Sequence, residues 1–197
     1  MNHLGRKLFH LLGGLGLLLI YFVVDRSAAF SIYGALAVLV LAVEFARLRI
    51  PAWNRFFYEH LGSFIRKSEE RKLSGTVPYI LGAGLSLYLY DAETAAAAIC
   101  FLAFGDVAAT TIGERYGKTK IRDKSLEGTI AFALAALAGG FLLFPFGLGL
   151  APWVLVFGAL VAAGTELLPI PVNDNFSIPV VAGAAMELSL GLVRHGL

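Results

Sequence analysis

The sequence is poor in charged residues and almost free of cysteine. Only 15% of its 197 residues are charged, whereas an average soluble domain has about 25%. The single cysteine, Cys100, excludes a disulfide within one chain and reads as a small apolar residue. In their place the chain is 58% hydrophobic, with apolar runs long enough to span a bilayer. This composition excludes an ordinary soluble domain and predicts an integral membrane protein.

The apolar runs predict an all-α, polytopic helical bundle that forms a single membrane domain over residues 1–197. The first run follows Arg6 and Lys7, so a cleaved signal peptide is an alternative, but six further runs favour a membrane anchor. The seven predicted spans are Leu8–Val24, Ala28–Phe45, Thr76–Tyr90, Ala92–Ile112, Gly128–Phe146, Ala151–Leu168 and Ile178–Val193.

Basic residues predict the orientation of the bundle. Seven spans would place fourteen of the sixteen Lys and Arg on one side, and only Arg26 and Arg194 on the other. Because basic loops stay in the cytoplasm, we expect the N-terminus and these loops to be cytoplasmic, at the inner membrane if the source is prokaryotic.

One cytoplasmic loop, residues 46–75, contains a second kind of element. Aromatic and aliphatic residues recur at helical spacing from Trp53 to Ile65, with polar residues on the opposite side, and Pro51 fits the first turn. The pattern predicts an interfacial amphipathic helix. It would be either a simple anchor or a wall beside a lipid entrance.

Carboxylates in the spans are costly and are not scattered. Glu44, Asp106 and Glu166 are each predicted near the cytoplasmic end of a span, with Asp174 in the following loop. A single carboxylate near the end of a span could simply extend its side chain to the membrane surface without forming a site. Their shared depth beside basic loops favours a site.

The segment GDVAATTIGERYGKTKIRDKSLEG, residues 105–128, combines a carboxylate, spaced glycines and basic residues. On a helix, Asp106, Thr110 and Gly113 share a face, and small neighbours leave room for a bulky polyanion. Such a loop suits a nucleoside triphosphate with Mg²⁺. The alternative is an ordinary positive-inside loop whose glycines stop a helix. The segment is not a Walker loop.

Several motifs resemble those of the CTP-dependent lipid-alcohol kinases, which include dolichol kinase, phytol kinase and CTP-using diacylglycerol kinase. The nucleotide motif of that family, D-x-x-A-x3-G-x3-G followed by K-K-[ST]-x-E-G, matches here except that Asp123 replaces the first lysine. The matching residues are Asp106, Ala109, Gly113 and Gly117, then Lys124, Ser125, Glu127 and Gly128. Shorter matches are Arg6, Lys7 and His10; Glu70 to Gly75; and Asp174, Asn175, Ile178 and Pro179.

The resemblance implies a kinase that transfers the γ-phosphoryl group of CTP to the hydroxyl of a membrane lipid alcohol. The acceptor would be a polyprenol or dolichol, a phytol-like isoprenoid or diacylglycerol. Asp106 and Asp174 would hold Mg²⁺, or one of them would accept the alcohol proton. Lys124 and Glu127 complete the expected catalytic set, and Lys7 and His10 would face the lipid. The expected nucleotide-binding residues are Gly113, Gly117, Lys118, Arg122, Lys124, Ser125, Asn175 and Lys72.

Two other functions stay open at this point. A CTP-dependent lipid phosphate cytidylyltransferase would also use CTP at the membrane, and a small transporter is an alternative of another class. The expected partners are CTP, the lipid alcohol and the bilayer, without nucleic acid. The sequence leaves a homo-oligomer open.

Overall fold

Helices make up most of the described part of the protein. The computed structural model describes residues 4–62 and 69–194. The helices are α1 (Leu4–Val23), α2 (Arg26–Arg49), α3 (Pro51–Leu61), α4 (Thr76–Leu89), α5 (Ala92–Tyr116), α6 (Leu126–Phe141), α7 (Pro152–Leu167) and α8 (Asp174–Arg194). A hairpin of two short strands, β1 (Lys120–Ile121) and β2 (Lys124–Ser125), joins α5 to α6. A short 3-10 helix, η2 (Phe144–Phe146), follows α6.

Every predicted span coincides with an apolar helix, and the all-α membrane bundle is confirmed. Four of these helices are long and apolar enough to cross a membrane: Arg26–Arg49, Ala92–Tyr116, Leu126–Phe146 and Asp174–Leu192. The other three, Lys7–Val23, Thr76–Leu89 and Pro152–Leu167, are apolar but shorter. The number of seven spans therefore stays a prediction.

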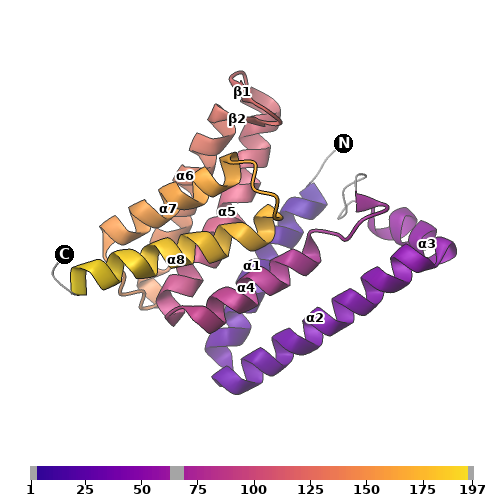
Figure 1. The fold of residues 1–197 in the computed structure, drawn as a ribbon, viewed down its shortest axis with the longest axis horizontal. Helices are drawn as coiled ribbons and strands as arrows, with labels where there is room; N and C mark the ends of the chain where they lie inside the picture. Colours follow the sequence, from indigo (N-terminus) through magenta and orange to yellow (C-terminus); the bar gives the residue numbers. More distant parts are fainter. Residues whose placement is uncertain (1–3, 63–68, 195–197) are drawn as a thin grey trace.

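Helix α5 forms the centre of the bundle. All ten residues from Thr94 to Ala103 are buried, so this part of α5 is covered on every side. Helix α5 packs against α1, α4, α6, α7 and α8, and in Figure 1 α8 crosses in front of it. The Ala95–Ala98 run lets neighbouring helices approach closely, as small residues do in membrane bundles.

Helix α3 agrees with the predicted amphipathic helix. It begins with Pro51 at its first position and has no buried residue. Its large aromatic residues Trp53 and Phe56 are exposed and stack on each other. The described helix ends at Leu61, and the predicted continuation through Phe64 and Ile65 lies outside the described residues.

The start of the last helix differs from the prediction. Helix α8 begins at Asp174, whereas the predicted span begins at Ile178, and Pro179 lies inside the helix. The side chain of Asn173 accepts a hydrogen bond from the Asn175 amide at 3.0 Å, which satisfies one of the free amides at the helix start. Because the helix starts earlier, Asp174 and Asn175 belong to its first turn.

Candidate nucleotide and acceptor site

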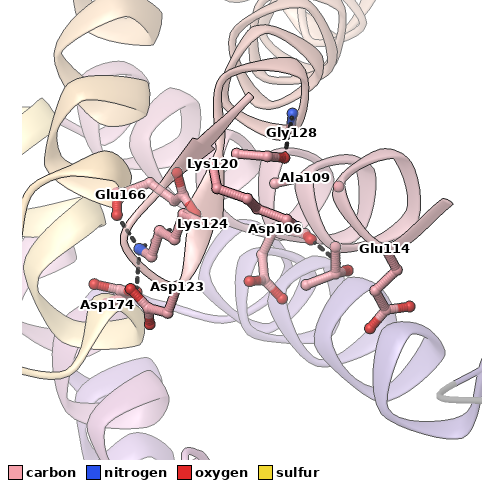
Figure 2. Close-up of a pocket in the computed structure, with 12 residues that line it drawn as sticks. Asp106, Ala109, Glu114, Lys120, Asp123, Lys124, Gly128, Glu166 and Asp174 are labelled. Carbon is pink, nitrogen blue, oxygen red and sulfur yellow. Dashed lines mark hydrogen bonds and ion pairs between the residues drawn. The ribbon is translucent and has the colours of Figure 1, made fainter. Parts of the chain in front are cut away.

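A cleft of about 370 Å³ lies where five segments meet at one end of the bundle (Figure 2). The C-terminal part of α5 forms one wall, and the hairpin, the start of α6, the end of α7 and the start of α8 complete it. The lining residues are Asp106, Ala109, Thr110, Gly113, Glu114, Lys120, Asp123, Lys124, Ser125, Gly128, Glu166 and Asp174. Asp106, Lys124 and Asp174, far apart in the sequence, therefore share one cleft.

Lys124 links the two sides of the cleft. Its ammonium nitrogen lies 2.9 Å from Asp174 Oδ2 and 3.2 Å from Glu166 Oε1, and it also donates to the Glu166 carbonyl (Figure 2). Burial lowers the pKa of Lys124, but these two carboxylates outweigh burial, so the pKa is raised above its usual value. Lys124 therefore carries a positive charge at neutral pH.

The α5 wall has the shared face predicted from the sequence. Asp106, Ala109, Thr110 and Gly113 all line the cleft, and the Thr110 hydroxyl donates back to the Asp106 carbonyl at 2.7 Å. Helix α6 packs closely against this part of α5 at Gly128. A Cβ atom at Gly128 would lie 3.0 Å from the Ala109 carbonyl oxygen. The small residues therefore keep the cleft open and let the helices cross closely.

Ser125 has a structural task as well as a place in the cleft. Its side-chain oxygen accepts a hydrogen bond from the Gly128 amide at 3.2 Å, which caps the start of α6. Because a helix start carries partial positive charge, α6 directs the positive end of its dipole towards this cleft.

Acidic groups nevertheless outnumber basic groups here. Five carboxylates line the cleft, those of Asp106, Glu114, Asp123, Glu166 and Asp174, against the ammonium groups of Lys120 and Lys124. The cleft therefore carries an excess of negative charge. Within the described part of the chain, no group of three or more His, Cys, Asp or Glu side chains could hold a metal ion.

A smaller polar pocket of about 60 Å³ adjoins the cleft. Asp106 and Asp174 line both spaces, so these two carboxylates form the boundary between them. The other lining residues of the pocket are Phe9, His10, Glu69, Ser74, Gly75, Thr76, Asn173 and Asn175. We call this space the acceptor pocket.

Asn175 and His10 meet in the acceptor pocket although they are 165 residues apart. Asn175 Nδ2 lies 3.3 Å from His10 Nε2 and donates to the Gly75 carbonyl at 2.9 Å. Asn175 was predicted to bind nucleotide, but it lies beside His10, which was predicted to bind lipid. The predicted lipid-facing Lys7 instead pairs at 3.4 Å with Glu114, a residue of the larger cleft.

The structure does not bring every predicted residue to the cleft. The Glu127 carboxylate, expected in the catalytic set, accepts hydrogen bonds from the Thr119 amide at 3.0 and 3.2 Å and so braces the hairpin without lining the cleft. Lys118 is exposed, and Arg122 lies exposed at the hairpin turn with a positive φ of 60°. Lys72 is exposed and lines neither space.

Gly117 ends α5 in a backbone conformation open to any residue, with φ at −68°. A glycine is needed here for room, because a Cβ atom would clash with the Gly113 carbonyl oxygen and lie 2.6 Å from Ser125 Oγ. Gly117 therefore allows the hairpin to fold back against α5, and it does not line the cleft.

The sequence also grouped Glu44 with the site acids, and the structure corrects this. Glu44 forms a buried ion pair with Arg47 at 2.8 Å, outside both spaces. Conversely, Glu166 was noted for its depth but was not assigned a role, and it proves to be a partner of Lys124. Its position at the end of an apolar helix was the signal that could have identified it.

Curated proteins with similar sequences are all named CTP-dependent diacylglycerol kinase 1. The Schizosaccharomyces pombe protein is 27% identical over 72% of this chain and 72% of its own length. The Saccharomyces cerevisiae protein is 28% identical over 66% of this chain, and the Eremothecium gossypii protein 32% identical over 47%. Those matches span 46% and 30% of the two relatives, respectively. The resemblance to CTP-dependent lipid-alcohol kinases is therefore confirmed.

Two other comparisons gave no match. No protein-family model matches the chain. No solved structure matches it either.

Proposed function

We propose that this chain, similar to CTP-dependent diacylglycerol kinases, is a CTP-dependent kinase of membrane lipid alcohols. The observation that carries the proposal is the shared boundary of Asp106 and Asp174 between a triphosphate-sized cleft and a small polar pocket. Diacylglycerol is the acceptor we favour, because the similar proteins carry that name. Polyprenols and phytol-like alcohols have the same primary hydroxyl and remain competing acceptors.

The larger cleft would hold the triphosphate of CTP. Lys124 and Lys120 supply positive charge, and the capped start of α6 directs its dipole into the same space. Gly113 and Gly128 let phosphate oxygens approach the backbone. Phosphoryl transfer depends mostly on positioning and on neutralising charge, and these groups do both.

Asp106 and Asp174 would hold Mg²⁺ together with phosphate oxygens. When bound, Mg²⁺ would neutralise charge that develops on the phosphates. Because Lys124 already contacts Asp174 at 2.9 Å, Asp106 is the carboxylate better placed to act on the acceptor.

The reaction would proceed at the boundary of the two spaces. The lipid hydroxyl oxygen in the acceptor pocket attacks the γ-phosphorus, and the bond from that phosphorus to the bridging oxygen of the β-phosphate breaks. The products are a lipid phosphate and CDP. Asp106, which lines both spaces, would accept the hydroxyl proton.

A direct assay tests this proposal. Purified protein receives γ-labelled CTP or ATP with Mg²⁺ and a panel of diacylglycerol, polyprenol and phytol. We expect labelled lipid with CTP and release of CDP. A cytidylyltransferase would instead release pyrophosphate. Absence of labelled lipid with every combination would refute the kinase.

Asp106→Asn provides the matched variant. It keeps the size of the side chain but removes the base and a metal ligand, so we expect kcat to fall by about 100-fold or more. Arg115→Met is the control, because Arg115 is exposed on the same helix and stacks on Tyr116. Equal activity of the two variants would remove Asp106 from the reaction.

We also propose that the cleft opens to the cytoplasm, where the basic loops are expected. A cysteine at Thr119, introduced after Cys100→Ala, should react with an impermeant thiol reagent only from the cytoplasmic side. Labelling from the opposite side would reverse this orientation.

A further inference from the structure

An apolar groove of about 360 Å³ lies on the other side of the acceptor pocket from the nucleotide cleft. Helix α2 forms one wall, and α1, α3 and the start of α4 form the others. The lining residues are Phe9, Leu39, Val40, Val43, Glu44, Phe57, Leu61, Ser74 and Thr76. We call this space the α2 groove.

The groove exists because α2 is held to the bundle mainly at its two ends. Near its start, Ala29 is buried and the Tyr33 hydroxyl donates to the Leu17 carbonyl of α1. Near its end, Glu44 and Arg47 bind the segment that leads into α4. Between these anchors Leu39 is 59% exposed. Figure 1 shows α2 running along the outside of the bundle.

The α2 groove is continuous with the proposed reaction site. Phe9, Ser74 and Thr76 line both the groove and the acceptor pocket. Asp106 and Asp174 then line both the acceptor pocket and the nucleotide cleft. Three neighbouring spaces therefore change from apolar to polar to strongly charged, in the order that a tail, a hydroxyl and a triphosphate require.

The size and charge of the acceptor pocket limit the head of the ligand. A space of about 60 Å³ accommodates only a few water-sized groups. Glu69, Asp106 and Asp174 would also repel a phosphate that entered from the membrane side. The pocket therefore suits a bare hydroxymethyl group and disfavours a phospholipid headgroup.

We propose that the α2 groove binds a hydrocarbon chain of the lipid alcohol and places its hydroxyl in the acceptor pocket. The hydrocarbon chain of the lipid enters the groove laterally from the bilayer, past Leu39 and Val43. The hydrocarbon chain has apolar surroundings both in the bilayer and in the groove, so the hydroxyl in the polar pocket supplies the selectivity for alcohols over other lipids. This proposal rests on the proposed function, since it assigns the acceptor subsite of the same reaction.

The test is photo-crosslinking with a long-chain alcohol that carries a diazirine in its tail. Peptide mass spectrometry of the purified protein in lipid nanodiscs should locate the label on Val40, Val43 or Leu61. Excess unlabelled alcohol should displace the label, whereas the methyl ether of the same chain should not. Labels confined to other helices, or equal displacement by the ether, would overturn the proposal.

Val43→Trp provides a second readout, because a bulky ring would fill the groove. We expect labelling to be lost and the KM for the lipid to rise by about tenfold, with the KM for CTP unchanged. The control is Leu160→Trp on α7, where Leu160 is 60% exposed away from the groove. Equal lipid KM values in the two variants would contradict the assignment.

The two proposals fail in different ways. Displaceable labelling in the groove without any phosphorylation would support the lipid site and refute the kinase. Phosphorylation with labelling elsewhere would support the kinase and refute the groove.

Discussion

At the scale of single residues, Lys124 shows what the sequence could and could not predict. Its place in the predicted nucleotide motif followed from its neighbours Ser125, Glu127 and Gly128. Its partners did not, because Glu166 and Asp174 lie 42 and 50 residues away. Local spacing identifies a residue of the right chemistry, but only tertiary packing determines what it contacts.

Lys124→Met should separate nucleotide use from lipid binding. The change removes the charge that would contact phosphate and leaves Asp174 and Glu166 to repel it. We expect kcat/KM for CTP to fall by about 100-fold or more. Arg115→Met should change it by less than about threefold. Steady-state kinetics with CTP varied would measure both, and similar values would exclude Lys124 from the nucleotide site.

The raised pKa of Lys124 also predicts how stability varies with pH. A group whose pKa is raised on folding contributes stability below its unfolded pKa and loses it as pH rises through the folded pKa. The pKa of Lys124 is raised from 10.5, so this loss begins only above that value. The stability difference between wild type and Lys124→Met should therefore stay constant from about pH 7 to 9. Chemical denaturation in detergent would measure it, and a marked change within that range would show that Lys124 titrates there.

At the scale of helices and strands, apolar runs predicted the helices but not their contacts. All seven runs are helical, because a long uncharged segment has no other stable form in lipid. The β1–β2 hairpin was missed because two-residue strands leave no periodic pattern. The close crossing of α5 and α6 depends on glycines whose partners the sequence does not reveal. At Gly105, a Cβ atom would lie 2.6 Å from the Phe132 ring.

Gly105→Ala should therefore destabilise the bundle. The added methyl group would push α6 away at Phe132, which is fully buried, and we expect a cost of about 1–3 kcal/mol. Gly84→Ala is the control, because nothing lies within 4 Å of a Cβ there and the helix gains propensity. Thermal unfolding in detergent should rank Gly105→Ala clearly below Gly84→Ala. The reverse order would mean that α5 and α6 do not cross as described.

At the scale of the whole molecule, a buried ion pair holds residues 70–74, which lead into α4, in place. Arg47 is fully buried and donates to the carbonyls of Glu70 and Lys72, while Glu44 accepts from the Ser74 amide. This segment leads directly into Ser74, Gly75 and Thr76 of the acceptor pocket. The sequence motif around Glu70 identified this segment as a candidate. Its contact with Arg47 of α2, which precedes Lys72 by 25 residues, could be seen only in the folded structure.

Arg47→Met should loosen this segment. It leaves the Glu44 carboxylate buried without its partner, and breaking one side of a buried pair costs about 3–5 kcal/mol. Arg49→Met is the matched control two residues later, because Arg49 is exposed and only stacks on Phe45. We expect a lower unfolding temperature and a higher lipid KM for Arg47→Met alone. Indistinguishable variants would show that the pair does not support the acceptor pocket.

Asp106 lines both the cleft and the acceptor pocket, and this has a consequence for inhibition. On the proposed function, a single compound that joins cytidine phosphates to a long alkyl tail would extend from the cleft through the acceptor pocket into the α2 groove. Its second half would bind at the high effective concentration that a short tether provides. Such a hybrid would block the enzyme more strongly than either fragment alone, and its preferred tether length would report the separation of the donor and the acceptor.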